Sequence, residues 1–126
     1  MAYRLIVYPE AHLVIYIYEG DVSFEELKQA RKEFFEIPEY TKLRHGVCDF
    51  RDAQKMVSMA ELTELSEDIK NTPEGVRWCL LNSTPKETGL SGLLIHQLDH
   101  TTRMGTFSTE RGASAFLGIN LEKYLK

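Results

Sequence analysis

The chain has 126 residues, a formal net charge of -4 and 43% hydrophobic residues, which is typical of one globular domain with a core of its own. Its positive charges are scattered rather than gathered in a stripe, so we expect no nucleic-acid partner. No apolar stretch approaches the roughly 20 residues of a membrane-spanning helix, and the first residues lack the pattern of a signal peptide. We therefore expect a single domain over residues 1–126 that resides in the cytoplasm without membrane insertion.

Two strands are predicted at the start of the chain. Residues 3–8 are rich in β-branched and aromatic side chains, and residues 12–18 repeat this composition after a short turn. So short a connection predicts an antiparallel hairpin. Both faces of the second strand are apolar, so we expect it near the centre of a sheet or covered on both sides. Residues 19–22 are predicted to form a turn.

Helices and strands then alternate along the chain. Ser23 and Glu26 have the spacing of a capping box at the start of a predicted helix, and Pro38 closes that helix. Further strands are predicted at residues 45–50, 76–81 and 103–107. Further helices are predicted to begin at Ser58, at Thr84 and at Ser108 or Thr109.

The predicted order is β-β-α-β-α-β-α-β-α, which indicates an α/β domain with a five-stranded mixed sheet, mostly parallel. Because crossovers between parallel strands are right-handed, consecutive crossovers would place the helices mainly on one face. The other face would be left to whatever packs there, such as a second copy of the chain.

Two cysteines, Cys48 and Cys79, lie inside predicted strands. A redox pair, or a zinc site together with His45, is one interpretation of them. The sequence has no CxxC spacing and no further ligand nearby, so two buried, reduced thiols are the simpler interpretation.

Charged residues follow the predicted strand at residues 45–50. Asp49, Arg51 and Asp52 stand where a parallel strand ends, and crevices beyond such carboxyl ends commonly bind ligands. An ion pair that closes the strand explains the same residues and is the simpler interpretation.

Hydroxyl and amide side chains follow at two helix starts. Asn82, Ser83 and Thr84 form the exit of the next strand, where an anion would suit the helix N-terminus, although turn and cap chemistry explains them as well. Ser58 has a similar position and would suit a phosphate, although capping explains it too. The candidate ligand or partner site therefore comprises Asp49, Arg51, Asp52, Ser58, Asn82, Ser83 and Thr84.

No pattern in the sequence indicates catalysis. His96 and His100 are one helical turn apart and Asp99 is adjacent, but a zinc site needs a third protein ligand that the sequence does not indicate. No Ser, His and Asp set has a nucleophile turn. Tyr16, Tyr18 and Trp78 suit a pocket or a core, and core is the simpler interpretation. We expect no enzyme activity, no metal and no cofactor.

Four features in order resemble the anti-sigma-factor antagonist class, the STAS-like domains. They are the opening hairpin, the strand exit Val47-Cys48-Asp49-Phe50-Arg51-Asp52-Ala53, the apolar strand at residues 76–81 and the closing segment at residues 105–117. The strand exit is similar to the family pattern hydrophobic-Asp-hydrophobic-Arg-Gly-Ala. The closing segment, Gly-Thr-Phe-Ser-Thr-Glu-Arg-Gly-Ala-Ser-Ala-Phe-Leu, is similar to the family's strand, acidic turn, Ala and aromatic-Leu. Together the four features span nearly the whole chain.

The resemblance implies an α/β domain with a non-enzymatic role in switching or partner binding. The divergent branch of this class is also likened to CRAL-TRIO lipid-exchange domains, which implies that a lipid or small apolar ligand is conceivable. The classical antagonists carry a phosphorylatable Ser in an Asp-Ser-x-Gly motif after the central strand. Residues 51–58 contain no such motif, which puts a kinase switch in doubt.

The first hypothesis is therefore a non-catalytic regulatory or scaffold domain that binds a protein partner, with a homodimer as one form. The alternative is a carrier of a small ligand or lipid. The least favoured hypothesis is an enzyme that uses Asp49, Arg51 and Asp52 together with Ser58 or Asn82.

Overall fold

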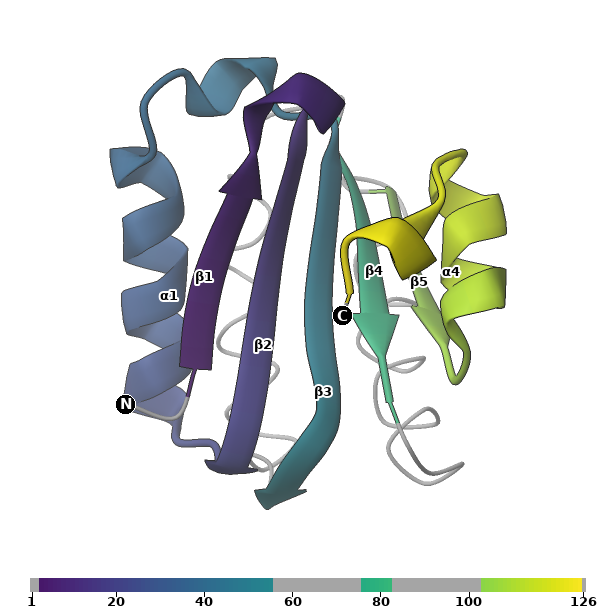
Figure 1. Cartoon of the computed structure of the whole chain (residues 1–126). Coiled ribbons are helices and arrows are strands. Elements are labelled where there is room, and N and C mark those ends of the chain that lie inside the picture. The colour runs from purple at the N-terminus through teal and green to yellow at the C-terminus, as the bar shows by residue number, and fades with distance from the viewer. Residues whose placement is uncertain (1–2, 56–75, 83–102, 126) are drawn as a thin grey trace.

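The computed structural model describes residues 3–55, 76–82 and 103–125, which Figure 1 shows in colour. Five strands form one sheet in the order β1-β2-β3-β4-β5. They are β1 (Tyr3–Tyr8), β2 (Leu13–Asp21), β3 (His45–Lys55), β4 (Arg77–Leu81) and β5 (Arg103–Phe107). β1 runs antiparallel to β2, and all other neighbours are parallel. The predicted mixed, mostly parallel α/β sheet is therefore confirmed.

Two α-helices are described, α1 (Phe24–Glu36) and α4 (Glu110–Leu117). Short 3-10 turns are found at Pro9–Ala11 (η1), Tyr40–Lys42 (η2) and Leu121–Lys123 (η3). The helices predicted to begin at Ser58 and at Thr84 lie outside the described residues.

The start and end of α1 follow from local chemistry. Ser23 Oγ accepts a hydrogen bond from the Glu26 backbone N–H at 3.1 Å, and Glu26 Oε1 accepts one from the Ser23 N–H at 3.4 Å. This is the predicted capping box. The helix stops at Ile37 because the residue before a proline is driven towards extended backbone, and Ile37 has that conformation.

One face of the sheet, called the α1 face here, packs against α1 and is rich in aromatic side chains. Its buried residues include Val14, Tyr16, Tyr18, Phe34, Phe50 and Trp78. The Phe34 and Trp78 ring centroids lie 5.6 Å apart in an edge-on arrangement. The Tyr16 hydroxyl donates to the Ala30 carbonyl of α1 at 2.8 Å. Tyr16, Tyr18 and Trp78 are core residues, as the simpler interpretation predicted.

The opposite face, called the α4 face, is aliphatic. Its buried side chains are Leu13, Ile15, Val47, Cys79, Leu81, Ala113, Leu117 and Leu121. The last three come from α4 and η3, which cover this side of the sheet in Figure 1. One of the two described helices therefore lies on each face. The prediction of helices mainly on one face also concerns the helices expected from Ser58 and Thr84, which lie outside the described residues. α1 is a crossover between the parallel neighbours β2 and β3, whereas α4 follows β5, the last described strand.

β2 and β3 are longer than the sequence predicted. The predicted turn at residues 19–22 is wrong, because β2 continues to Asp21 and pairs there with the extended end of β3. Ile17 pairs with Asp49, but Glu19 pairs with Asp52, so β3 contains an extra residue between these pairs. A second irregularity follows Gly20, whose φ of 68° is a conformation that favours glycine. Such bulges bend a strand and redirect its side chains.

Both cysteines are free thiols, but they lie on opposite faces of the sheet. Cys48 packs against the α1-face cluster, and Cys79 is fully buried in the α4-face cluster. Burial raises the pKa of each thiol to about 12, so neither is a thiolate near neutral pH. The structure therefore agrees with two free thiols, of which Cys79 is buried and Cys48 is partly buried.

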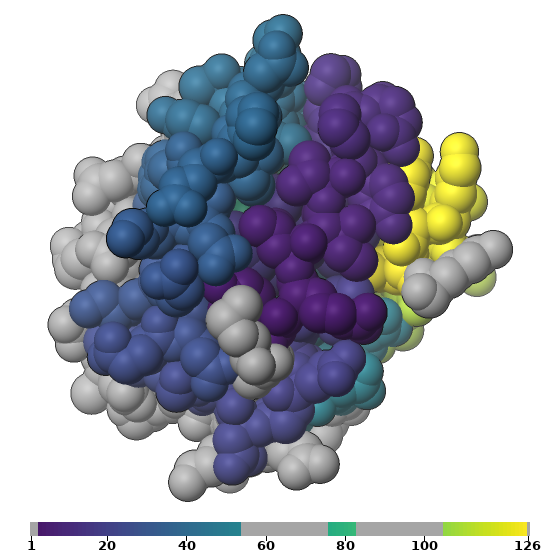
Figure 2. Space-filling view, turned by 60° about the vertical axis from the view of Figure 1, so that its left-hand side comes forward, coloured from purple at the N-terminus to yellow at the C-terminus, as the bar shows by residue number. Residues whose placement is uncertain are grey.

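Among the described strands, β1 forms one edge of the sheet. Figure 2 shows its residues, in purple, at the surface between α1 and the yellow C-terminal residues. All six residues of β1 pair with β2 without a register shift.

Candidate functional site

A buried ion pair occupies the predicted strand exit of β3. Asp49 is only 6% exposed. Its Oδ1 accepts hydrogen bonds from Nε of Arg51 at 2.9 Å and from the Arg51 backbone N–H at 3.1 Å, and its Oδ2 accepts one from Nη2 at 2.9 Å. The two residues are two apart in β3, within the segment that holds the extra residue, and the backbone N–H of Arg51 also points to the Asp49 carboxylate. The fork of the guanidinium matches the two carboxylate oxygens.

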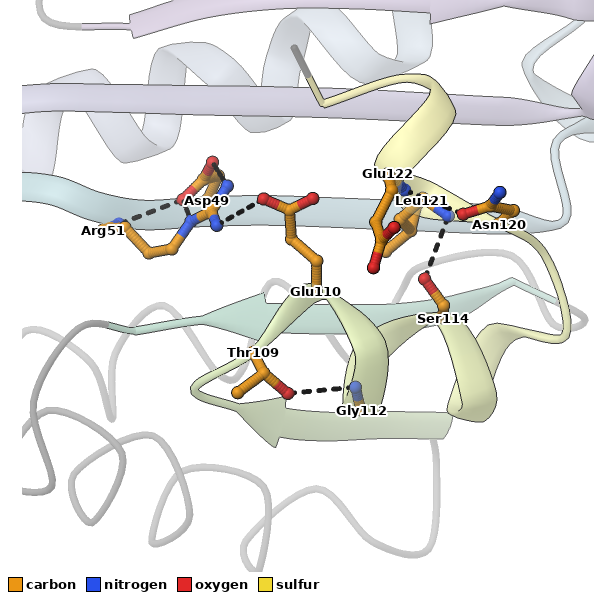
Figure 3. Close-up of polar contacts among 9 residues, drawn as sticks. All are labelled: Asp49, Arg51, Thr109, Glu110, Gly112, Ser114, Asn120, Leu121 and Glu122. Carbon is orange, nitrogen blue, oxygen red and sulfur yellow. Dashed lines mark hydrogen bonds and ion pairs between the residues drawn. The ribbon is translucent and has the colours of Figure 1, made fainter.

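A second carboxylate completes the arrangement. Nη1 of Arg51 donates to Oε2 of Glu110 at 2.8 Å, and Figure 3 shows Arg51 between the two acids. Glu110 is the first residue of α4, where a negative charge is favoured by the helix dipole. Its place is fixed by Thr109, whose Oγ1 accepts from the Gly112 N–H at 3.0 Å. We call Asp49, Arg51 and Glu110 the Asp–Arg–Glu network.

The network engages most of what Arg51 can donate. Its Nε, Nη1 and Nη2 atoms all have carboxylate partners. The hydrogen bond to Asp49 raises the pKa of the guanidinium above its usual value, despite the partial burial that opposes this. The arrangement ties β3 to the start of α4 by a link that spans 59 residues of sequence. The predicted ion pair of Asp49 and Arg51 is therefore present, but it does not close the strand, because β3 continues to Lys55.

Asp52 and Asn82 do not join the network. Asp52 is exposed and lies opposite Glu19 in the register of β2 and β3. Asn82 is 2% exposed, and its Nδ2 donates to Oγ1 of Thr106 at 2.9 Å. Since side chains alternate along a strand, Asn82 lies on the same side as Leu80, towards the α1 face. Asp49 instead shares the α4 face with Val47, so the sheet separates the two candidates.

Ser58, Ser83 and Thr84 lie outside the described residues, and so do His96, Asp99 and His100. Their roles stay predictions. Within the described ranges, no group of three His, Cys, Asp or Glu side chains is placed to hold a metal ion.

Glu110 is the member of the network that sequence reasoning missed. From its neighbours in sequence alone, Glu110 is explained as an acidic residue that follows a capping Thr and stabilises the start of a helix. The available signal was the resemblance, because Arg51 belongs to the strand-exit segment and Glu110 to the closing segment.

His45 stands at the other end of β3. Its Nδ1 atom is buried and has no hydrogen-bond partner among the described residues. Burial lowers the pKa of this imidazole, and the positive charges of His12 and Arg77 lower it further. Among the described residues, the buried ring nitrogen of His45 therefore lacks the partner that polar atoms in protein interiors normally have.

The comparisons with known proteins assign this chain to no family. No protein-family model matches the sequence, and no curated protein matches it. In the parts of the chain that the structure describes, neither helix has the length and apolar character needed to span a membrane.

Proposed function

We propose that this chain is a non-catalytic, STAS-like domain that acts by binding a protein partner. The observation that carries the proposal is the 2.8 Å contact between Arg51 and Glu110. The two residues come from the two charged segments on which the resemblance rests, residues 47–53 and residues 105–117. That these segments meet at one point of the fold supports reading them as parts of one motif.

The geometry of the network supports a structural role rather than acid-base chemistry. A general base must reach the proton that it removes from a substrate. Both oxygens of Asp49 instead face donors of Arg51, and burial raises the pKa of both cysteine thiols. The network therefore suits a structural role. It holds the middle of β3 and the start of α4 in a fixed relation, which a docking surface requires.

Asp52 marks the exposed part of this end of the sheet. It follows the network directly in β3, and its side chain is exposed. A partner that docks at the carboxyl ends of the strands would meet this carboxylate. Reversing its charge should weaken such a complex without disturbing the fold, since exposed substitutions usually change stability little.

Quantitative affinity capture from cells that make the protein tests the proposal. We expect wild type to enrich at least one protein, which Asp52→Arg loses. Glu36→Arg makes a similar change from acid to arginine at the exposed C-terminal end of α1 and should retain that protein. Identical captured sets for all three baits, or no enrichment over empty beads, would refute the proposal. A small apolar molecule retained in native mass spectrometry would instead favour the carrier alternative.

A further inference from the structure

We infer that β1 is the surface on which a second copy of this chain pairs, strand against strand, to extend the sheet. An edge strand presents unpaired backbone N–H and C=O groups to any strand that can lie beside it. β1 is the first strand of the sheet that the described residues form, and its residues are at the surface in Figure 2. Pairing through β1 deepens the proposed function, on which it rests, by naming the second copy as a partner.

β1 lacks the features with which proteins usually protect an edge. Such features are prolines, lysines, bulges or short strands. The strand reads Tyr-Arg-Leu-Ile-Val-Tyr, so its only charged residue is Arg4. It pairs with β2 over its full length without a register shift, so no bulge turns the edge away from a neighbour.

Ile6 differs from the other apolar residues of β1 in its relation to the core that the described residues form. Leu5 and Val7 pack against the α1-face cluster, and Tyr8 packs against the α4-face cluster. Ile6 is half-buried and belongs to neither described cluster. A second strand beside β1 would cover it.

Symmetry selects how two copies would pair. Antiparallel strands related by a two-fold axis normal to the sheet keep matching faces on the same side, so one residue lies opposite its own copy. With Ile6 on the axis, Leu5 faces the partner's Val7, and Arg4 faces the partner's Tyr8. Each pair is apolar against apolar, or a cation beside an aromatic ring, and both combinations are favourable.

The charge of Arg4 does not oppose this arrangement. Nη2 of Arg4 lies 3.3 Å from Oε1 of Glu19 in the same chain, so each copy brings a neutralised pair to the interface. The two-fold axis also keeps the two arginines apart. Arg4 and its copy would be separated by four residue steps, or about 14 Å at 3.4 Å per residue.

Sedimentation of the full chain gives the first test. We expect wild type to be a dimer and Ile6→Lys to be a monomer, because a lysine on the axis would face its own copy. Phe35→Lys is the matched control, since Phe35 is an exposed apolar residue of α1, and it should remain a dimer. A monomeric wild type, or an Ile6→Lys protein that is still dimeric, would overturn the inference.

Cross-linking tests the register and does not depend on how Ile6→Lys folds. Facing residues of an antiparallel pair have Cα atoms about 4.5–5.5 Å apart, which is within reach of a disulfide. With oxidised glutathione, Ile6→Cys should become a covalent dimer, while Arg4→Cys and wild type should not. Absence of the cross-link, or equal cross-linking of Arg4→Cys, would contradict pairing about Ile6. Because these readouts report on Ile6 and the capture experiment on Asp52, the two proposals can fail separately.

Discussion

The two faces of the sheet are buried by different means. On the α1 face, aromatic rings fill the space and also carry polar groups, as when the Tyr16 hydroxyl donates to the Ala30 carbonyl. On the α4 face the side chains are aliphatic, and the polar links lie at the ends of α4. Arg51 contacts Glu110 at its start, and Ser114 Oγ accepts from the Leu121 N–H at 3.0 Å near its end. The orientation of α1 thus depends on its core contacts, whereas that of α4 depends more on its terminal bonds.

The largest effect is expected from the aromatic core of the α1 face. Phe34 is 1% exposed, whereas its neighbour Phe35 is 38% exposed. Phe34→Ala should lower the free energy of unfolding by about 4 kcal/mol, because a large cavity remains. Phe35→Ala should cost less than about 1 kcal/mol. Urea unfolding followed by circular dichroism measures both, and equal losses would show that the α1 face is not the tight core described here.

A second substitution tests how closely the α1 face is filled. A Cβ atom at Gly46 would lie 2.4 Å from the Trp78 ring, so Gly46→Ala should cost about 2 kcal/mol by overpacking. Trp78→Leu should cost less in the Gly46→Ala background than in wild type, because the smaller side chain removes the clash. Additive losses in a thermal or urea double-mutant cycle would contradict this contact.

A similar loss is expected from the ion pair of the α4 face. Arg51→Met would leave the buried Asp49 carboxylate without its partner and should cost about 2 kcal/mol, less than a fully buried pair because Arg51 is 30% exposed. Adding Asp49→Asn should restore part of the loss. Arg4→Met, which breaks the exposed pair with Glu19, should cost less than about 1 kcal/mol. If Arg51→Met and Arg4→Met cost the same, the network is not what fastens α4.

The smallest effect is a pH dependence from His45. Its pKa is lower in the folded chain than in the unfolded one, so the unfolded chain binds the proton more readily. Stability should therefore be complete above about pH 6.5 and should be lost as the pH falls through the lower, folded pKa. His45→Gln should remove this contribution, so urea midpoints compared above and below that pH should differ less in the variant. An unchanged difference would exclude His45 as its source.

Local signals were enough to predict the strands and the first helix. β1 and β5 have the predicted bounds, because apolar, β-branched runs between turn residues mark strands on their own. The capping box at Ser23 and the stop before Pro38 also depend only on neighbours in sequence. The parallel order of β2 to β5 followed from the alternation of strands with predicted helices.

What the sequence did not predict depends on contacts between distant segments. β3 continues past Phe50 because the tail of β2 is present to pair with it, and no pattern in residues 51–55 indicates such pairing. Asn82 and Asp49 point to opposite faces of the sheet because of the register between β3 and β4. The alternation of side chains within one strand does not predict that register. Glu110 joins the network only because α4 crosses to the face that Arg51 points to.

The two cysteines can serve as probes of unfolding, because they lie on different faces of the sheet. Cys48 and Cys79 come from adjacent strands but lie beneath different layers. Cys79 is fully buried, so an alkylating reagent reaches its sulfur atom only after the α4 layer has opened, whereas Cys48 is partly buried and reports on the α1 layer. The order in which the two cysteines are alkylated during slow denaturation would reveal whether the domain unfolds cooperatively or whether one helix layer unfolds before the other.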